Sequence, residues 1–180
     1  EANRARVGDD ALGARICAEL ADEGVDVSRV RRVPHCVSPS AAILVAADGS
    51  PFTKRMLAYL AAHDEWLGAH HAYTVLTVVP PVPARAASVL SKDVLTSYYN
   101  DESEKVFKPI RPFFAKQGLN AEFVAKHGHA ADTIAAMADK GKYDLLVLGS
   151  HGHGSLANLV MGSVATKVVA QCGVPVLLVR

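Results

Sequence analysis

The chain has 180 residues, half of them apolar, and its 19 Lys and Arg nearly balance its 18 Asp and Glu. This length suits one domain with a sizeable core and a short appendage. The near-neutral charge argues against non-specific nucleic-acid binding, which depends on clustered cations, and no apolar run reaches the roughly 18 residues of a membrane span. The cysteines Cys17, Cys36 and Cys172 show neither metal-ligand spacing nor a disulfide framework, so we expect a cytoplasmic protein.

The first 40 residues are polar and rich in Arg, and one helix, about Ala11–Glu23, followed by a linker is expected there. The sequences VGDDALG at 7–13 and LADEGVD at 20–26 resemble part of the ribokinase-like sugar kinases. The resemblance is short and lacks the glycine-rich sugar site and the later catalytic Asp region of those kinases. We therefore interpret residues 1–40 as a leader without an independent function.

From residue 41 onward, short apolar runs alternate with helical patterns. The runs are typical of strands buried on both faces of a parallel sheet, and they cover Ala42–Ala47, Tyr73–Val79, Ala121–Ala125, Asp144–Leu148 and Pro175–Val179. The helices expected between them are one that starts at Pro51, Ser91–Lys116, Ala130–Lys140 and Ser163–Cys172. This alternation predicts an α/β fold: a doubly wound, Rossmann-like five-stranded parallel sheet with helices on both faces and the strand order 3-2-1-4-5.

Local signals refine two of these helices. Ser50 can cap the helix that starts at Pro51, where the missing N–H of proline costs nothing. Pro109 and Pro112 predict a kink or a break in the helix expected at Ser91–Lys116. Gly118 is a suitable residue to end this helix.

The most informative segment is GSHGHGSLANLVMGS, from Gly149 to Ser163, which joins the fourth strand to the last helix. Glycines allow tight turns and let a phosphate approach main-chain N–H groups. The start of the helix near Gly162 would add unpaired N–H groups and the positive end of the helix dipole. The alternative is an ordinary glycine-rich turn followed by Ser163 as the helix cap. The pattern is neither GxGxxG nor a P-loop, because no Lys follows the last glycine.

The spacing Gly149-x2-Gly152-x9-Gly162-Ser163 resembles the ATP-binding motif of the universal stress proteins, G-x2-G-x9-G-(S/T). Other segments resemble the strands of the same family in the same order: ILVAADGS at 43–50, VLTVVPP at 75–81, DLLVLGSHG at 144–152 and GVPVLLV at 173–179. The chain from about 41 to 180 is thus identified as a universal stress protein domain of the ATP-binding subgroup.

The resemblance implies which residues contact the nucleotide. Asp48 would lie near the ribose or the base, the main chain of Val78 at the adenine edge, and Gly149 at the ribose. The phosphates would lie on Gly152, Gly162, Ser163 and Val164, and His151 and His153 could add hydrogen bonds. Ala46 replaces the proline that the family usually has before the acidic residue, which loosens the turn beside the base.

Alternative interpretations accompany two of these assignments. Asp48 could simply cap the turn into Ser50. His151 and His153 could suggest a metal, but an H-x-H on a loop without a Cys or Asp cluster is weak, and we expect no metal site in the protein itself.

The resemblance implies an ATP-binding stress-response or signalling module in which ATP, alone or with Mg²⁺ or Mn²⁺ carried by its phosphates, is a ligand and is not consumed. It also implies a homodimer formed through the last strand, Val174–Val179, and no nucleic-acid or membrane partner. A slow ATPase or another ATP-using enzyme is the alternative; against it, the motif region has no Lys and no acidic pair for Mg²⁺. An interaction module with an empty pocket is a third reading.

Overall fold

The computed structural model describes residues 6–28, 30–34, 41–153 and 161–180. Its first unit contains strand β1 (Arg6–Gly8), helix α1 (Ala11–Asp22) and strand β2 (Arg31–Val33), and the two strands pair in parallel. The Asp10 side chain caps α1 by accepting a hydrogen bond from the N–H of Gly13 at 2.7 Å. The sequence predicts the helix but not the two strands, because three residues are too few to show a periodic pattern.

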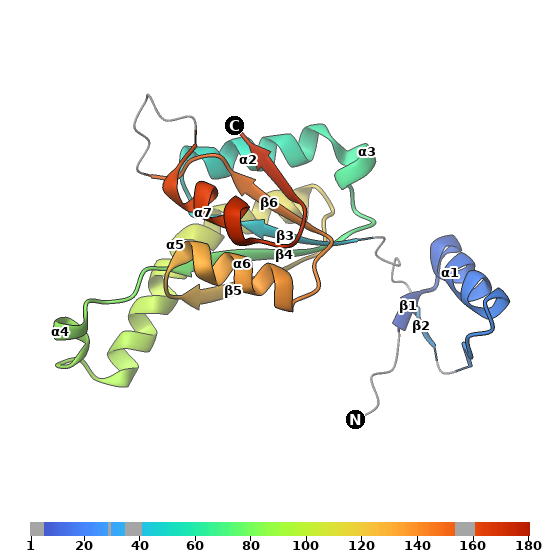
Figure 1. Ribbon diagram of the computed structural model, residues 1–180, viewed down its shortest axis with the longest axis horizontal. Helices are drawn as coiled ribbons and strands as arrows, with labels where there is room; N and C mark the ends of the chain where they lie inside the picture. The colour runs from blue at the N-terminus through green and yellow to red at the C-terminus, as the bar shows by residue number, and fades with distance from the viewer. Residues whose placement is uncertain (1–5, 29, 35–40, 154–160) are drawn as a thin grey trace.

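Five parallel strands form the main sheet in the order β5-β4-β3-β6-β7 (Figure 1). Their bounds are Ala42–Ala46 for β3, Ala72–Val79 for β4, Ala121–His127 for β5, Leu145–Gly149 for β6 and Val176–Val179 for β7. β3 lies at the centre, where Val45 pairs with Val75 of β4 and with Val147 of β6. Counted from β3, this is the order 3-2-1-4-5, so the predicted fold class and strand order are confirmed.

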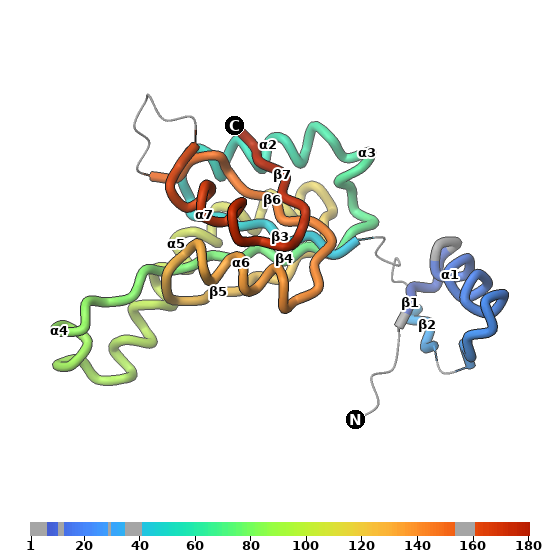
Figure 2. Tube along the Cα trace, viewed as in Figure 1, coloured from blue at the N-terminus to red at the C-terminus, as the bar shows by residue number. Residues whose placement is uncertain are grey.

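Helices cover both faces of this sheet (Figure 1). Their bounds are Pro51–Ala62 for α2, Asp64–Leu67 for α3, Ala84–Ala87 for α4, Lys92–Lys116 for α5, Ala130–Lys140 for α6 and Ser163–Gln171 for α7. The trace in Figure 2 shows α4 and the first turns of α5 extending away from the sheet. The sequence predicts the four longer helices to within a few residues and misses the single turns α3 and α4.

Two apolar layers hold the helices on the sheet, because successive side chains of a strand point to opposite faces. The layer under α2 and α5 includes Ile43, Val45, Val75, Met56, Leu60, Phe107 and Ile110. The layer under α6 and α7 includes Leu44, Leu76, Leu146, Ile134, Ala138 and Val168. The central strands are therefore buried on both sides, as their unbroken apolar sequences predict.

Helix α5 continues through both of its prolines, contrary to the break that they could cause. Each interior proline costs a helix about 3 kcal/mol. Phe107, Ile110 and Phe114 project from the same helix into the core, and burying each such side chain contributes about 1.5–3 kcal/mol. Tertiary packing thus outweighs the local penalty, and Gly118, at a φ of 66°, follows the helix end as predicted.

Tyr73 ties the start of β4 to the turn after α3. Its side chain is buried, and its hydroxyl donates to the carbonyl oxygens of Leu67 and Gly68. Burial raises the pKa of Tyr73 to about 12, because the phenolate would lose its hydration. This tyrosine is therefore a neutral structural residue of the layer under α5.

Candidate functional site

A cleft of about 650 Å³ opens at the carboxyl ends of β3, β4 and β6, with α5, α6 and α7 around it. Ligands of open parallel sheets usually bind at this edge, where the connections diverge to opposite faces. All ten residues predicted for the site line this one cleft: Ala46, Asp48, Val78, Gly149, His151, Gly152, His153, Gly162, Ser163 and Val164. Chain segments more than 100 residues apart are thus brought to one place.

One part of the cleft is apolar. The buried side chains of Leu76 on β4 and Leu148 on β6 line this part from the sheet, and Ala130 and Ile134 line it from α6. Ala46, which replaces the usual proline, also lines this part of the cleft, and its small side chain is buried. Apolar lining of this kind suits a planar ring system, because a ring can bury both of its faces against apolar side chains.

Asp48 forms the turn between β3 and α2 and also faces the cleft. Its Oδ1 accepts hydrogen bonds from the N–H of Ser50 and from Oγ1 of Thr53, each at 2.9 Å. Oδ2 has no hydrogen-bond partner among the described residues, and a Cβ on Gly152 would lie 2.6 Å from it. One oxygen of Asp48 therefore caps the turn, as the alternative interpretation predicts, and the contact with a nucleotide stays a prediction.

Gly162 leaves little room for a side chain where the loop after β6 meets the start of α7. A Cβ on Gly162 would lie 3.2 Å from the Cα of His151 and 3.3 Å from the carbonyl oxygen of Ser150. The N–H of Gly162 donates to that same oxygen at 2.8 Å. Because both neighbours are main-chain atoms, neither can rotate away from a side chain at this position.

The first turn of α7 presents unpaired N–H groups to the cleft. The helix starts at Ser163 with Gly162 as its N-cap, and its first internal bond runs from Thr166 to Gly162. Among the described residues, no acceptor is bonded to the N–H of Ser163 or Val164. The reading of Ser163 as the cap is therefore wrong, since a glycine takes that position and no side chain closes the helix end. Such an end favours an anion.

The two histidines lie on the loop beside this helix end. Nε2 of His153 is 2.8 Å from the carbonyl oxygen of Asp48. Nδ1 of His151 is 3.0 Å from Oγ of Ser150, and its ring lies 5.0 Å from that of Phe52. In the part of the chain that the structure describes, no group of three or more His, Cys, Asp or Glu side chains is placed to hold a metal ion.

Several lining residues carry no motif and are missed by sequence reasoning. They are Thr53, Thr77, Glu102, Val106, Ala130 and Ile134. Thr53 could be inferred from the capping position three residues after Ser50. The residues on α5 and α6 could not, because only the packing of these helices brings them over the edge of the sheet.

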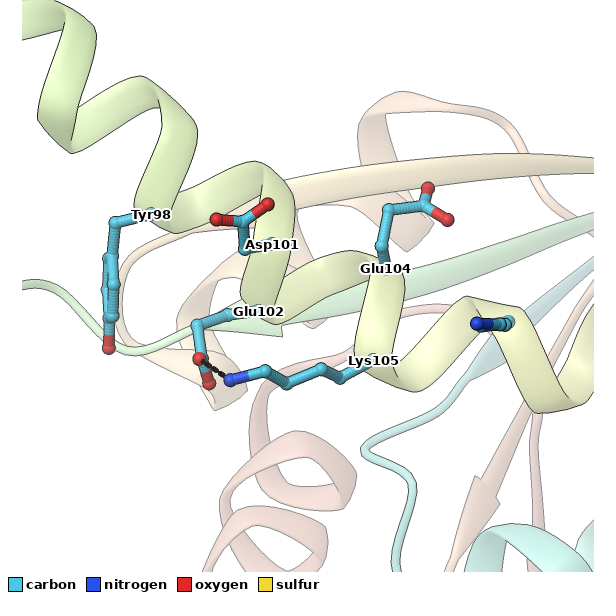
Figure 3. A pocket seen from close by; sticks show the side chains of 6 residues that line it. Tyr98, Asp101, Glu102, Glu104 and Lys105 are labelled. Carbon is cyan, nitrogen blue, oxygen red and sulfur yellow. Dashed lines mark hydrogen bonds and ion pairs between the residues drawn. The ribbon is translucent and has the colours of Figure 1, made fainter.

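A second hollow, of about 520 Å³, lies on the exposed surface of α5 (Figure 3). The side chains of Tyr98, Asp101 and Glu104 project from α5, and Glu102 on the same helix forms an ion pair with Lys105. Arg111 is bonded to Glu104, and this pairing lowers the pKa of the Glu104 carboxyl. The surface is charged and open to solvent, so exposed pairs of this kind add little to stability.

Comparison with known proteins matches residues 41–180 to the model of the universal stress protein family. The chain belongs to the universal stress protein family. Stress response protein NhaX of Bacillus subtilis is 32% identical over 162 residues, covering 77% of this chain and 96% of that protein. A universal stress protein of Thermus aquaticus is 34% identical over 143 residues, covering 77% of this chain and 97% of its own length.

Solved structures of universal stress proteins share this fold. One from Archaeoglobus fulgidus in complex with dAMP has a TM-score of 0.55 and 20% identity, and covers 78% of this chain and 98% of its own. One from Arabidopsis thaliana with AMP bound has a TM-score of 0.56 and 16% identity, over 77% of this chain and 90% of its own. A third, in complex with cAMP, has a TM-score of 0.56 and 21% identity, over 78% and 97%.

The family match begins at residue 41, so the resemblance of the leader to sugar kinases gains no support from it and stays a prediction. No helix among the described residues combines the length and apolar character needed to cross a membrane.

Proposed function

We propose that this universal stress protein binds an adenine nucleotide, ATP in particular, in the cleft at the carboxyl edge of the sheet. The observation that carries the proposal is that one cleft combines an apolar part with glycines beside the N-terminus of α7. The apolar part suits a purine, and the helix N-terminus suits a phosphate. The adenine nucleotides in complexes with proteins of the same family support this choice of ligand.

Each part of the nucleotide has a matching group in the cleft. The base would lie against the main chain of Val78, and a ribose hydroxyl would donate to the available Oδ2 of Asp48. The phosphates would accept from main-chain N–H groups near Gly152 and from those of Ser163 and Val164. A Cβ on Gly152 would lie 2.6 Å from Oδ2 of Asp48, so a side chain there would displace the carboxylate proposed for the ribose.

The nucleotide would act as a bound ligand in a stress-response or signalling role. Among the described residues that line the cleft there is neither Lys nor Arg, and such cations usually stabilise the charge that develops in phosphoryl transfer. An ATP-using enzyme of the same fold is the alternative, in which His151 or His153 would have to orient a water molecule.

Mass spectrometry of the nucleotide released when the purified protein is denatured tests this proposal. We expect ATP or another adenine nucleotide in near-stoichiometric amount, and phosphate release under saturating ATP well below the roughly 1 s⁻¹ of slow enzymes. A guanine nucleotide, or no nucleotide together with no binding of added ATP, would contradict the proposal. Turnover of several per second that is lost with Gly162→Val would favour the enzyme.

The proposal includes a homodimer formed through the last strand. β7 is an edge strand, so its outer N–H and C=O groups have no partner within the sheet. Leu178 is exposed on this strand. Pairing with the same strand of a second copy would satisfy those groups across a two-fold axis.

A further inference from the structure

The phosphate end of the cleft has an unusual charge balance. The two carboxylates that line the cleft are Asp48 and Glu102, and no Lys or Arg is found among its described lining residues. The sequence of residues 149–165 contains neither Lys nor Arg. The helix end of α7 supplies only about half an elementary charge. Of the side chains known to line the cleft, only His151 and His153 can become positive there.

Hydrogen bonds orient both imidazoles. A carbonyl oxygen can only accept, so Nε2 of His153 donates its hydrogen to Asp48. Taking up a proton therefore places the added N–H on Nδ1 of His153. Nδ1 of His151 is bonded to the hydroxyl of Ser150, which can donate or accept. The ring of His153 can thus gain a proton without losing its bond to Asp48, and Oγ of Ser150 can accept when Nδ1 of His151 carries a hydrogen.

The charged groups around the histidines come from three elements. The carboxylate of Asp48 belongs to the turn before α2, and Glu102, which is ion-paired with Lys105, lines the cleft from α5. The guanidinium of Arg55 lies 5.0 Å from the centre of the Phe52 ring, and the His151 ring lies 5.0 Å from the same ring. Carboxylate and guanidinium groups ordinarily keep their charge between pH 5 and 8, whereas histidine is the side chain that changes charge there.

We infer that His151 and His153 select nucleotides by phosphate charge in a pH-dependent way, an inference that rests on the proposed nucleotide site. Protonation supplies the positive charge that the cleft otherwise lacks, so nucleotides with more phosphates gain affinity as the pH falls from about 8 to 6. A hydrogen bond to a charged group is worth at least about tenfold in binding. Adenosine, which carries no phosphate, gains nothing. The bound population of ATP relative to AMP then responds to pH.

Calorimetric titration of the full chain with adenosine, AMP and ATP at pH 8, 7 and 6, in the presence of EDTA, tests this inference. We expect the Kd of ATP to fall about tenfold between pH 8 and 6, the Kd of AMP to fall less, and that of adenosine to change by less than about twofold. In the double variant His151→Gln, His153→Gln the ATP response should be lost. Glutamine keeps a side-chain N–H for the carbonyl of Asp48 but carries no charge.

Two further variants make the test specific. His153→Lys carries its charge throughout this pH range, so its ATP affinity at pH 8 should approach the wild-type value at pH 6. His70→Gln changes a histidine between α3 and β4, outside the lining of the cleft, and should leave the wild-type pH response unchanged.

Each phosphate ligand also loses negative charge as it takes up a proton near pH 6, and the double variant measures this contribution alone. An equal pH response of ATP binding in the wild type and the folded double variant would overturn the inference while leaving the nucleotide site intact. Absence of binding by all three ligands at every pH would overturn the proposed function and this inference with it.

Discussion

Replacing Gly162 with valine is expected to weaken ATP binding by about a hundredfold or more. A Cβ at this position would lie 3.2 Å from the Cα of His151 and 3.3 Å from the carbonyl oxygen of Ser150. The larger valine must push the loop away from the start of α7, so the phosphates lose N–H donors on both sides. Losing two hydrogen bonds to a charged ligand, each worth about 1.5–3 kcal/mol, accounts for a change of this size.

Titration calorimetry on the purified variant measures this change, with circular dichroism to confirm that it is folded. A matched pair of smaller substitutions separates the site from a general effect of losing glycine. Gly162→Ala should weaken binding, whereas Gly173→Ala should not, because a Cβ on Gly173 meets only the Asp139 carboxylate at an ordinary 3.4 Å. Wild-type ATP affinity in folded Gly162→Val would remove the phosphate assignment.

Replacing Leu178 with proline is expected to convert the proposed dimer into a monomer at micromolar concentration. The carbonyl oxygens of Pro175 and Val179 face β6, where they accept from Leu146 and Ser150. Since the main-chain groups of successive strand residues point alternately to the two sides, the N–H of Leu178 points to the open edge. Proline at this position removes an outward donor and spares the bonds between β7 and β6.

Light scattering coupled to size exclusion measures the mass of the wild type and the variant. Leu178→Val keeps both the N–H and an apolar side chain, so it should remain a dimer and serves as the control. A wild-type mass of one chain would contradict the proposed interface. A dimeric Leu178→Pro protein would place the interface on another surface.

The order of the elements could be predicted because each strand of the main sheet is a continuous apolar run, such as Ile43–Val45, between helical patterns. The path of α5 could not. Pro109 and Pro112 argue locally against a continuous helix, and only the burial of Phe107 and Phe114 against the sheet outweighs that penalty. Local signals of this kind are overridden whenever the packing of distant residues contributes more free energy.

The part of the candidate site that contains the glycine motif could be predicted from the sequence, whereas the parts on α5 and α6 could not. The described parts of the motif, residues 149–153 and 161–163, lie at one edge of the sheet, as the sequence predicts. Glu102 and Ile134 belong to helices whose sequences show only amphipathic patterns, so their positions over the cleft emerge from packing alone. The roles of all these residues toward a nucleotide remain predictions, as does the cytoplasmic location.

Amide chemical shifts of ¹⁵N-labelled protein, recorded during titration with ATP, report both whether ATP binds and where it binds. We predict saturable shifts that are largest at Gly152, Gly162, Ser163 and Val164, with smaller changes at Val78 and Asp48. Residues at the opposite edge of the sheet, such as Tyr73, should stay unchanged. No saturable shift, or shifts centred on the outer surface of α5, would contradict the assignment of this cleft as a nucleotide site.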